Sequence, residues 1–292
     1  FETWDEFSYE YPTNYGFNAN MLEALSGGQT MNVQKTTNAQ HGNYALKLIN
    51  QSTSSDFDFG FIMNVNGNDG DPSTWLGGFP IQGRPTGISG YYQYSESTRD
   101  SGMIIVGFNK NGQVLHTYML PLKGQMTSFT PFDFTFDPPL AEDPDSMVLG
   151  FSSTSHMEGG AWPGCELLID NLSIKGLTTQ PVGMNGDFEA WQTETRVSPN
   201  GWSYNQWQEG SFTRTNEATE GQWAVCLTTT LEENDQEEGL IAVGSSITNG
   251  YWDDEFDKQR GGVAFSNTKD TLIFQYKYLP ANTDDRGMVV LD

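Results

Sequence analysis

Tryptophans in three loop-like stretches are the residues whose type and setting best fit a binding chemistry. Each stands among Gly, Pro, Ser or Asp rather than in an alternating apolar pattern; they are Trp75, Trp162 and Trp252. The apolar C–H face of a sugar ring stacks on an indole, and the sugar hydroxyls need polar partners nearby. The loops therefore predict glycan contacts at these three positions, with simple loop anchors as the alternative.

Two tyrosines, Tyr92 and Tyr94, alternate along one apolar stretch. Successive side chains of a strand point to opposite faces, so alternation places both rings on the same face. We expect these rings either to line a concave sheet face, where they would contact a sugar, or to belong to the core.

Groups able to catalyse a reaction are present but form no recognisable motif. Glycoside hydrolysis needs two carboxylates roughly 5–9.5 Å apart, and 38 acidic residues leave such a pair possible. The histidines are scattered, at His41, His116 and His156. A jelly-roll polysaccharide lyase would need a Tyr/His acid–base pair and a basic side chain that neutralises the uronate. Tyr92 and His116 could form the pair, and Arg84 or Arg99 could be the basic side chain. We expect no catalysis, with a lyase or glycoside hydrolase as an alternative.

The net charge limits the classes of partner that the protein can bind. Acidic residues outnumber basic ones 38 to 14, which gives a net charge of -24. Such a field repels phosphate backbones and anionic lipids, so it argues against nucleic acid and membrane surfaces. Neutral glycans and divalent cations remain compatible. No apolar run reaches the ~18 residues that a membrane span needs, so we expect no insertion beyond a possible lipid anchor.

The chain repeats itself. Phe1-Glu2-Thr3-Trp4 recurs as Phe188-Glu189-Ala190-Trp191, and Gly42-Asn43-Tyr44-Ala45 recurs as Gly221-Gln222-Trp223-Ala224. The order and spacing of such pairs are nearly conserved between the copies. We therefore predict two tandem modules, residues 1–176 and 184–292, joined by a linker rich in Gly, Thr and Pro. The second copy ends where closing strands should follow, so we expect the natural protein to be longer.

Short strands and frequent turns determine the expected fold. Alternation is clear in Tyr44-Leu46-Leu48 and again over 114–120, and Gly, Asn, Asp and Pro separate the strands. No long stretch repeats apolar residues at helical spacing. This pattern predicts an all-β fold of jelly-roll β-sandwich type.

At these positions the chain resembles jelly-roll carbohydrate-binding modules. The resemblance rests on Phe1-Glu2-x-Trp4, on the turn and strand from His41 to Leu46, and on Ile169-Asp170-Asn171-Leu172-Ser173-Ile174. The stretch 149–153 is also similar to the carbohydrate-metabolism domains of exported gut-bacterial lipoproteins. The chain has one residue fewer than the family pattern between His41 and Ala45. The resemblance covers the first copy and the beginning of the second, and it implies an exported, cell-surface or extracellular location.

The resemblance also implies a structural calcium ion. In this fold the first and last strands are neighbours, so Glu2 and Asp170 would meet at one end of the sandwich. The turn from Gln40 to Asn43 would add backbone carbonyls, and calcium takes 6–8 such oxygen ligands. Ordinary solvated carboxylates are the alternative.

Together these observations predict a non-catalytic glycan-binding protein, stabilised by calcium, whose partner is a polysaccharide or another glycan. A structural or adhesion spacer without sugar binding is the second hypothesis, and an enzyme is the third. The charge and the loop tryptophans favour the first.

Overall fold

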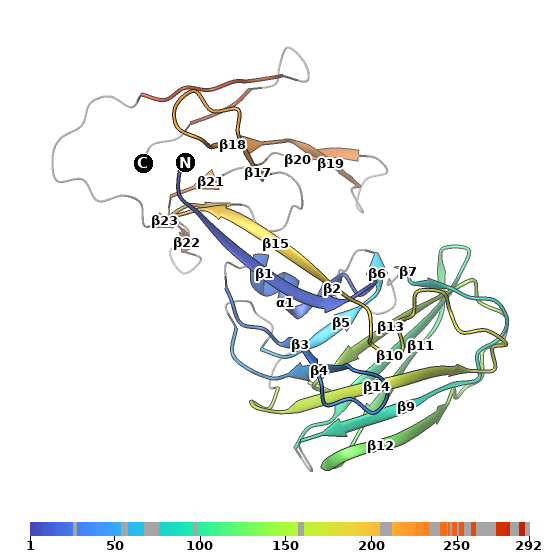
Figure 1. Cartoon of the computed structure of the whole chain (residues 1–292). Coiled ribbons are helices and arrows are strands. Elements are labelled where there is room, and N and C mark those ends of the chain that lie inside the picture. The colour runs from blue at the N-terminus through green and yellow to red at the C-terminus, as the bar shows by residue number, and fades with distance from the viewer. Residues whose placement is uncertain are drawn as a thin grey trace. The chain divides into compact units, whose positions relative to one another are not determined.

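The computed structural model (Figure 1) describes residues 1–25, 28–53, 58–66, 76–95, 99–156, 161–204, 212–233, 240–243, 245, 247–249, 251–253, 258–260, 273–280 and 286–289. The chain forms two compact units. The first unit is residues 6–196, and the second unit is residues 197–292 together with residues 1–5.

The first unit is built from two antiparallel sheets, as the alternating pattern predicted (Figure 1). One sheet has the order β11 (Gln113–Leu122), β10 (Gly102–Lys110), β13 (Ser146–Ser152), β5 (Phe61–Met63), β2 (Phe17–Asn18), with β8 (Phe79–Pro80) also on β13. The other has the order β12 (Met126–Thr135), β9 (Gly87–Tyr94), β14 (Glu166–Lys175), β4 (Ala45–Ile49), β3 (Val33–Thr36). A short pair, β6 (Val65–Asn66) and β7 (Leu76–Gly77), is separate. The all-β, sandwich-type fold class is confirmed.

The core of the first unit lies between the two sheets. Aromatic rings from different strands meet there: the rings of Phe108 and Tyr118 each pack on Phe136, with centroids 5.3 and 4.6 Å apart. Burying one such side chain contributes roughly 1.5–3 kcal/mol. Because every second residue of β9 points inward, Ile88, Tyr92 and Tyr94 join the same core.

Among the described residues there is one short helix, α1 (Ala19–Leu25), which was not predicted from the sequence. It follows Asn18, whose side-chain oxygen accepts a hydrogen bond from the amide of Met21 at 2.9 Å and so caps the helix. Asn20 exchanges two hydrogen bonds with the backbone of Val33, which fixes the helix against β3. In the part of the chain that the structure describes, no helix has the length and apolar character to cross a membrane.

The expected linker belongs to the packed structure of the first unit. The side chain of Gln180 bonds both backbone groups of Ile174, and the amide of Leu172 donates to the carbonyl of Gly186. Phe188 is fully buried against Tyr15. The predicted boundary near 176–184 therefore differs from the observed division between residues 196 and 197. Gly, Thr and Pro mark turns here, but these turns are held by side-chain hydrogen bonds and one buried ring.

The strands β1 (Trp4–Pro12) and β15 (Trp191–Pro199) form a two-stranded sheet, and each contributes residues to both units. The described strands of the second unit form antiparallel pairs. They are β16 (Ser203–Tyr204) with β21 (Ile247–Thr248), β17 (Phe212–Thr215) with β18 (Ala224–Leu227), β19 (Thr230–Glu233) with β20 (Leu240–Val243), and β22 (Tyr251–Asp253) with β23 (Lys258–Arg260). The stretches 273–280 and 286–289 are exposed and irregular. A second jelly roll stays a prediction.

Candidate functional site

A carboxylate is captured by a tight turn in the first unit. Oε1 of Glu189 accepts hydrogen bonds from the amides of Asn43 and Tyr44 at 2.7 and 2.8 Å, and Oε2 accepts one from the Asn43 side chain at 3.1 Å. Gly42 has a φ of +72°, and a Cβ atom there would collide with the Glu189 carboxylate. The turn thus needs glycine both for its backbone conformation and for the space that the carboxylate occupies.

Aromatic rings and a cation flank this turn. The Lys35 ammonium lies 5.3 Å from the ring centre of Tyr44 and 5.7 Å from that of Trp191. The indole N–H of Trp191 donates to the carbonyl of Phe188 at 2.6 Å, which fixes the ring beside Glu189. The Lys35 charge therefore contacts two π faces and adds a cation–π attraction to the carboxylate contact.

The same turn holds a second carboxylate, that of Asp170 in β14. Its Oδ2 accepts the amides of Gln40 and His41 at 2.7 and 2.9 Å, and its side chain is buried. Burial raises the pKa of Asp170 and the nearby charge of Glu189 raises it further, although backbone amides act in the opposite direction. Two negative charges therefore converge on one short turn.

The second unit contains the same contact. The amides of Gln222 and Trp223 donate to the carboxylate of Glu2 at 2.8 and 3.3 Å. Gly221 has a φ of +74°, and a Cβ there would collide with that carboxylate. The Arg214 guanidinium lies 5.6 Å from the ring centre of Trp4 and 4.6 Å from that of Trp223.

The predicted metal ligands are therefore only partly brought together. Gln40, Asn43 and Asp170 lie at one turn, but the turn directs amide N–H groups, not the expected carbonyls, at the carboxylates. The predicted partner Glu2 is bound in the second unit, and Glu189 is the carboxylate that reaches the turn beside Asp170. The two glutamates open identical motifs, so sequence alone could not tell which of them pairs with which turn.

The carboxylates of Asp170 and Glu189 are the groups that a hard cation would use at this turn. Burial is the main cause of the raised pKa of Asp170, and the charge of Glu189 adds to it. Calcium prefers such carboxylate and carbonyl oxygens. Within the described ranges no cluster of three or more His, Cys, Asp or Glu side chains is found, so backbone and amide oxygens of Gln40 and Asn43 would have to complete the set.

A different end of the first unit presents Trp162. Its side chain is 42% exposed, while its carbonyl accepts a hydrogen bond from the Asn50 side chain at 3.0 Å. The guanidinium of Arg99 stacks 3.9 Å from the indole centre. An exposed ring thus stands beside a cluster of hydrogen-bond donors.

A buried aspartate organises the loops around Trp162. Asp100 accepts hydrogen bonds from the Thr154 hydroxyl at 2.7 Å, from the Ser155 amide at 3.0 Å and from the Trp162 amide at 3.4 Å. The Nε2 atom of His156 lies 4.0 Å from Asp100 Oδ1. Sequence reasoning missed Asp100 because its partners lie more than 50 residues away.

The tyrosines predicted to contact a sugar are core residues. Tyr92 and Tyr94 are 7% and 1% exposed, and their hydroxyls donate to the carbonyls of Lys123 and Ser153. The prediction of a ligand contact is therefore wrong for both, and the core alternative holds, because alternation cannot say which face of a strand is covered. Trp75 lies outside the described residues. The side chain of Trp252 does too, although its backbone, in β22, pairs with that of Gln259 in β23.

The groups considered for a lyase are engaged elsewhere. The Tyr92 hydroxyl bonds the Lys123 carbonyl, Arg84 forms an ion pair with Asp143 at 2.7 Å, and Arg99 stacks on Trp162. His116 packs against Tyr118, with ring centres 4.3 Å apart. Each candidate group thus has a structural contact of its own.

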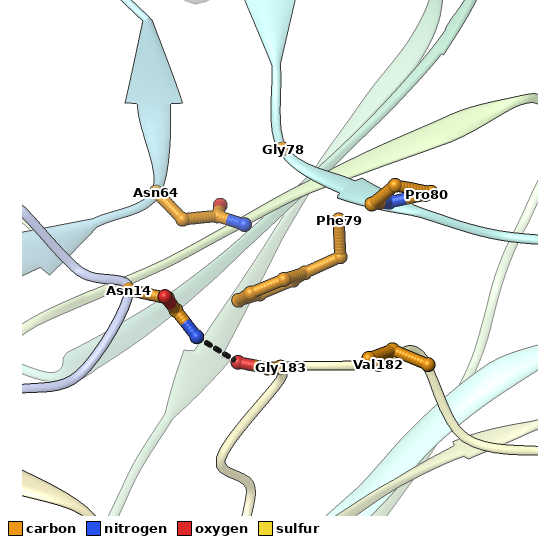
Figure 2. A pocket seen from close by; sticks show the side chains of 7 residues that line it. All are labelled: Asn14, Asn64, Gly78, Phe79, Pro80, Val182 and Gly183. Carbon is orange, nitrogen blue, oxygen red and sulfur yellow. Dashed lines mark hydrogen bonds between the residues drawn. The ribbon is translucent and has the colours of Figure 1, made fainter.

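Figure 2 shows a pocket of about 450 Å³ in the first unit. It is lined by Asn14, Asn64, Gly78, Phe79, Pro80, Val182 and Gly183. The Asn14 side chain donates to the Gly183 carbonyl at 2.8 Å and closes one wall. The buried amide nitrogen of Asn64 has no hydrogen-bond partner among the described residues.

Comparison with known proteins gives weak likenesses. No family model and no curated protein matches the chain. A solved structure from Bacteroides thetaiotaomicron, described as a candidate glycoside hydrolase, is 13% identical over 56% of this chain and 63% of its own, less than two thirds of its length, with a TM-score of 0.43. A family 16 carbohydrate-binding module is 11% identical over 49% of this chain and 84% of its own, with a TM-score of 0.29.

A third structure is the C-terminal family 6 carbohydrate-binding module of a marine laminarinase from Zobellia galactanivorans. It is 12% identical over 56% of this chain and 99% of its own, with a TM-score of 0.27. The chain is thus similar to carbohydrate-binding modules and to a hydrolase-like protein. At these identities and TM-scores, the likeness says nothing of what the chain binds.

Proposed function

We propose that this protein binds a neutral glycan without cleaving it, through the loop surface of Trp162 and Arg99. The carrying observation is the exposed indole with a guanidinium stacked 3.9 Å from its centre. The part of the indole that the guanidinium does not cover would stack on the C–H face of a sugar, whose hydroxyls would need polar partners nearby.

The rigidity of these loops supports this proposal. Asp100 accepts hydrogen bonds from two positions, Ser155 and Trp162, in the connection between β13 and β14, and Asn50 donates to the Trp162 carbonyl. A ring fixed in place loses little conformational entropy when a ligand binds, which favours affinity. An exposed aromatic on a rigid base is better suited to binding than to a purely structural role.

The charge supports a neutral ligand. With a net charge of -24, the chain repels uronates and sulfated sugars at long range. The absence of catalysis is part of the proposal and is supported by the separate structural contacts of Tyr92, His116 and Arg84. An exported location at the cell surface, with or without a lipid anchor, fits a glycan ligand.

A calcium ion is the second part of the proposal. Asp170 and Glu189 would hold it, together with oxygens of Gln40 and Asn43. Its charge would favour the ionised form of Asp170, which burial and, to a smaller extent, the charge of Glu189 disfavour. The ion would stabilise the fold and take no part in sugar contact, since Trp162 depends on a separate set of hydrogen bonds.

A glycan array probed with the whole chain tests the proposal, followed by calorimetry with the best neutral oligosaccharide. Trp162→Ala should weaken binding about tenfold to a hundredfold, as expected for a central aromatic contact. Trp162→Phe should retain part of the affinity. Met119→Ala, which removes an exposed apolar side chain on β11, is the matched control and should change nothing.

Three outcomes would contradict the proposal. Binding to no glycan, with and without chelator, would favour a structural spacer. Equal loss in the Trp162 and Met119 variants would place the site elsewhere, and the pocket in Figure 2 would be the next surface to test. Release of new reducing ends from any polysaccharide would show an enzyme.

A further inference from the structure

We infer that the turns 42–44 and 221–223 are docking sites for a Phe-Glu-x-Trp segment, and that such a segment from a second copy of this chain can fill them. In the structure each site is filled by the segment that opens the other repeat. Residues 1–5 belong to the second unit, and residues 188–191 belong to the first. This inference is independent of the proposed glycan function.

Both sites bind the glutamate carboxylate in the same way. Two consecutive backbone amides donate to its carboxylate, and a glycine with positive φ leaves room for it. Charge-assisted hydrogen bonds of this kind are shorter and stronger than neutral ones, and a side chain at the glycine would exclude the carboxylate. The glutamate is therefore a recognised residue at both sites.

Both sites also contact the tryptophan ring of the segment. Its indole N–H donates to the carbonyl three residues earlier, at 2.6 Å in Trp191 and 2.7 Å in Trp4. A cation from the neighbouring strand, Lys35 or Arg214, contacts this ring and the aromatic residue of the turn. The local hydrogen bond presets the shape of the segment, so it presents Glu and Trp together.

Matching contacts extend beyond the motif. The amide of Thr13 donates to the carbonyl of Ala190 at 3.0 Å, and the amide of Asn200 donates to that of Thr3 at 2.9 Å. Phe188 packs on Tyr15 with centroids 6.3 Å apart, and Phe1 packs on Trp202 at 5.3 Å. Each repeat therefore supplies equivalent residues to receive the segment that opens the other repeat.

Because the contacts are equivalent, the two sites recognise the same type of segment. A segment of the same chain binds with the advantage of a high effective concentration, so an identical segment from another molecule, which can make the same contacts, competes with it only when the protein is concentrated. Exchange of identical elements between copies is a low-cost route to dimers. The partner that fits these sites is thus a second copy of the chain.

A peptide in trans tests the inference directly. The double variant Glu2→Ala/Trp4→Ala of the full chain leaves the 221–223 site without its own segment. A labelled peptide of residues 1–13 should bind this variant at one site and restore hydrogen-exchange protection to the amides of Gln222 and Trp223. The same peptide with Glu2→Gln should bind at least about tenfold more weakly, because the charge-assisted bonds are lost.

Further arms keep the inference falsifiable. The single variant Glu2→Gln serves if the double variant does not fold, and Gly221→Val should block the peptide. Wild-type chain refolded at high concentration should form a two-copy species by light scattering, and Trp4→Ala should reduce it several-fold. Equal binding of the two peptides, or no binding, would overturn the docking site. A single-copy species at every concentration would overturn exchange between copies.

Discussion

The two turns that capture a glutamate differ in one respect. In the first unit Glu189 shares its turn with buried Asp170, whose carboxylate is bound by the amides of Gln40 and His41. In the second unit, Glu2 is the only carboxylate that the described contacts place at 221–223. The shared features hold a segment in place, whereas the additional carboxylate of the first unit supplies the charge that a cation would offset.

The largest expected effect comes from filling the space at the glycines. A β-branched residue at positive φ costs about 1–3 kcal/mol, and at Gly42 and Gly221 the new side chain also collides with a carboxylate. Calorimetry of Gly42→Val should show a lower transition for the first unit, and Gly221→Val a lower transition for the second.

Gly112→Val is the matched control, because Gly112 has a φ of +73° and open space around it. It carries the backbone strain without the collision. If Gly42→Val lowers the unfolding temperature no more than Gly112→Val, the carboxylate contact does not stabilise the first unit.

Calcium should stabilise the first unit but not the second. A ligand at 100 times its dissociation constant stabilises the folded state by about 2.7 kcal/mol. We expect calcium to raise the unfolding temperature of the first unit only, and Asp170→Asn to abolish the rise. Asp143→Asn, at an exposed carboxylate, is the control and should retain the full rise. An equal rise in both units would remove the distinction drawn from Asp170.

The cations between the rings should have smaller and similar effects. Cation–π contacts at exposed sites contribute about 0.5–1 kcal/mol each, so Lys35→Ala and Arg214→Ala should each destabilise their own unit slightly. Lys35 also pairs with Glu10 at 2.7 Å, and Glu10→Gln separates that contribution. Chemical denaturation of each variant measures the change. A large effect of Glu10→Gln would mean that the ion pair, not the rings, accounts for the loss.

The smallest expected difference between the units is in the stability that each loses when the pH is lowered. Amide hydrogen bonds lower the pKa of Glu2 and Glu189 below the ordinary value of 4.5, so their stabilisation is present above that pH and is lost as the pH falls through the lowered values. Burial raises the pKa of Asp170, so its contribution is greatest at low pH and is lost as the pH rises. Without calcium, the second unit should therefore lose more stability than the first between pH 5 and about pH 3. Thermal melts across this range measure the difference, and a greater loss in the first unit would contradict it.

Local sequence patterns predicted much of the fold. Alternation in Tyr44-Leu46-Leu48 identified β4, and Gly42 marked the turn before it. Asp170 was correctly placed beside that turn. These features depend on neighbours along the chain or on a motif shared with known modules.

Features that depend on distant contacts were missed. Tyr92 and Tyr94 alternate in the same way whether they face the core or a ligand, and only the packing of β9 decides. Asp100 binds loops far along the chain, so no local pattern marks it. Glu2 and Glu189 open equivalent motifs, so their exchange between units depends on the course of β1 and β15.

Amide hydrogen exchange in the Glu2→Gln variant of the chain tests the central structural claim most directly. The account predicts faster exchange at the amides of Gln222 and Trp223, with Asn43 and Tyr44 unchanged, and the reverse for Glu189→Gln. Faster exchange at Asn43 and Tyr44 in the Glu2 variant would show that each opening segment serves its own repeat, and would contradict the account.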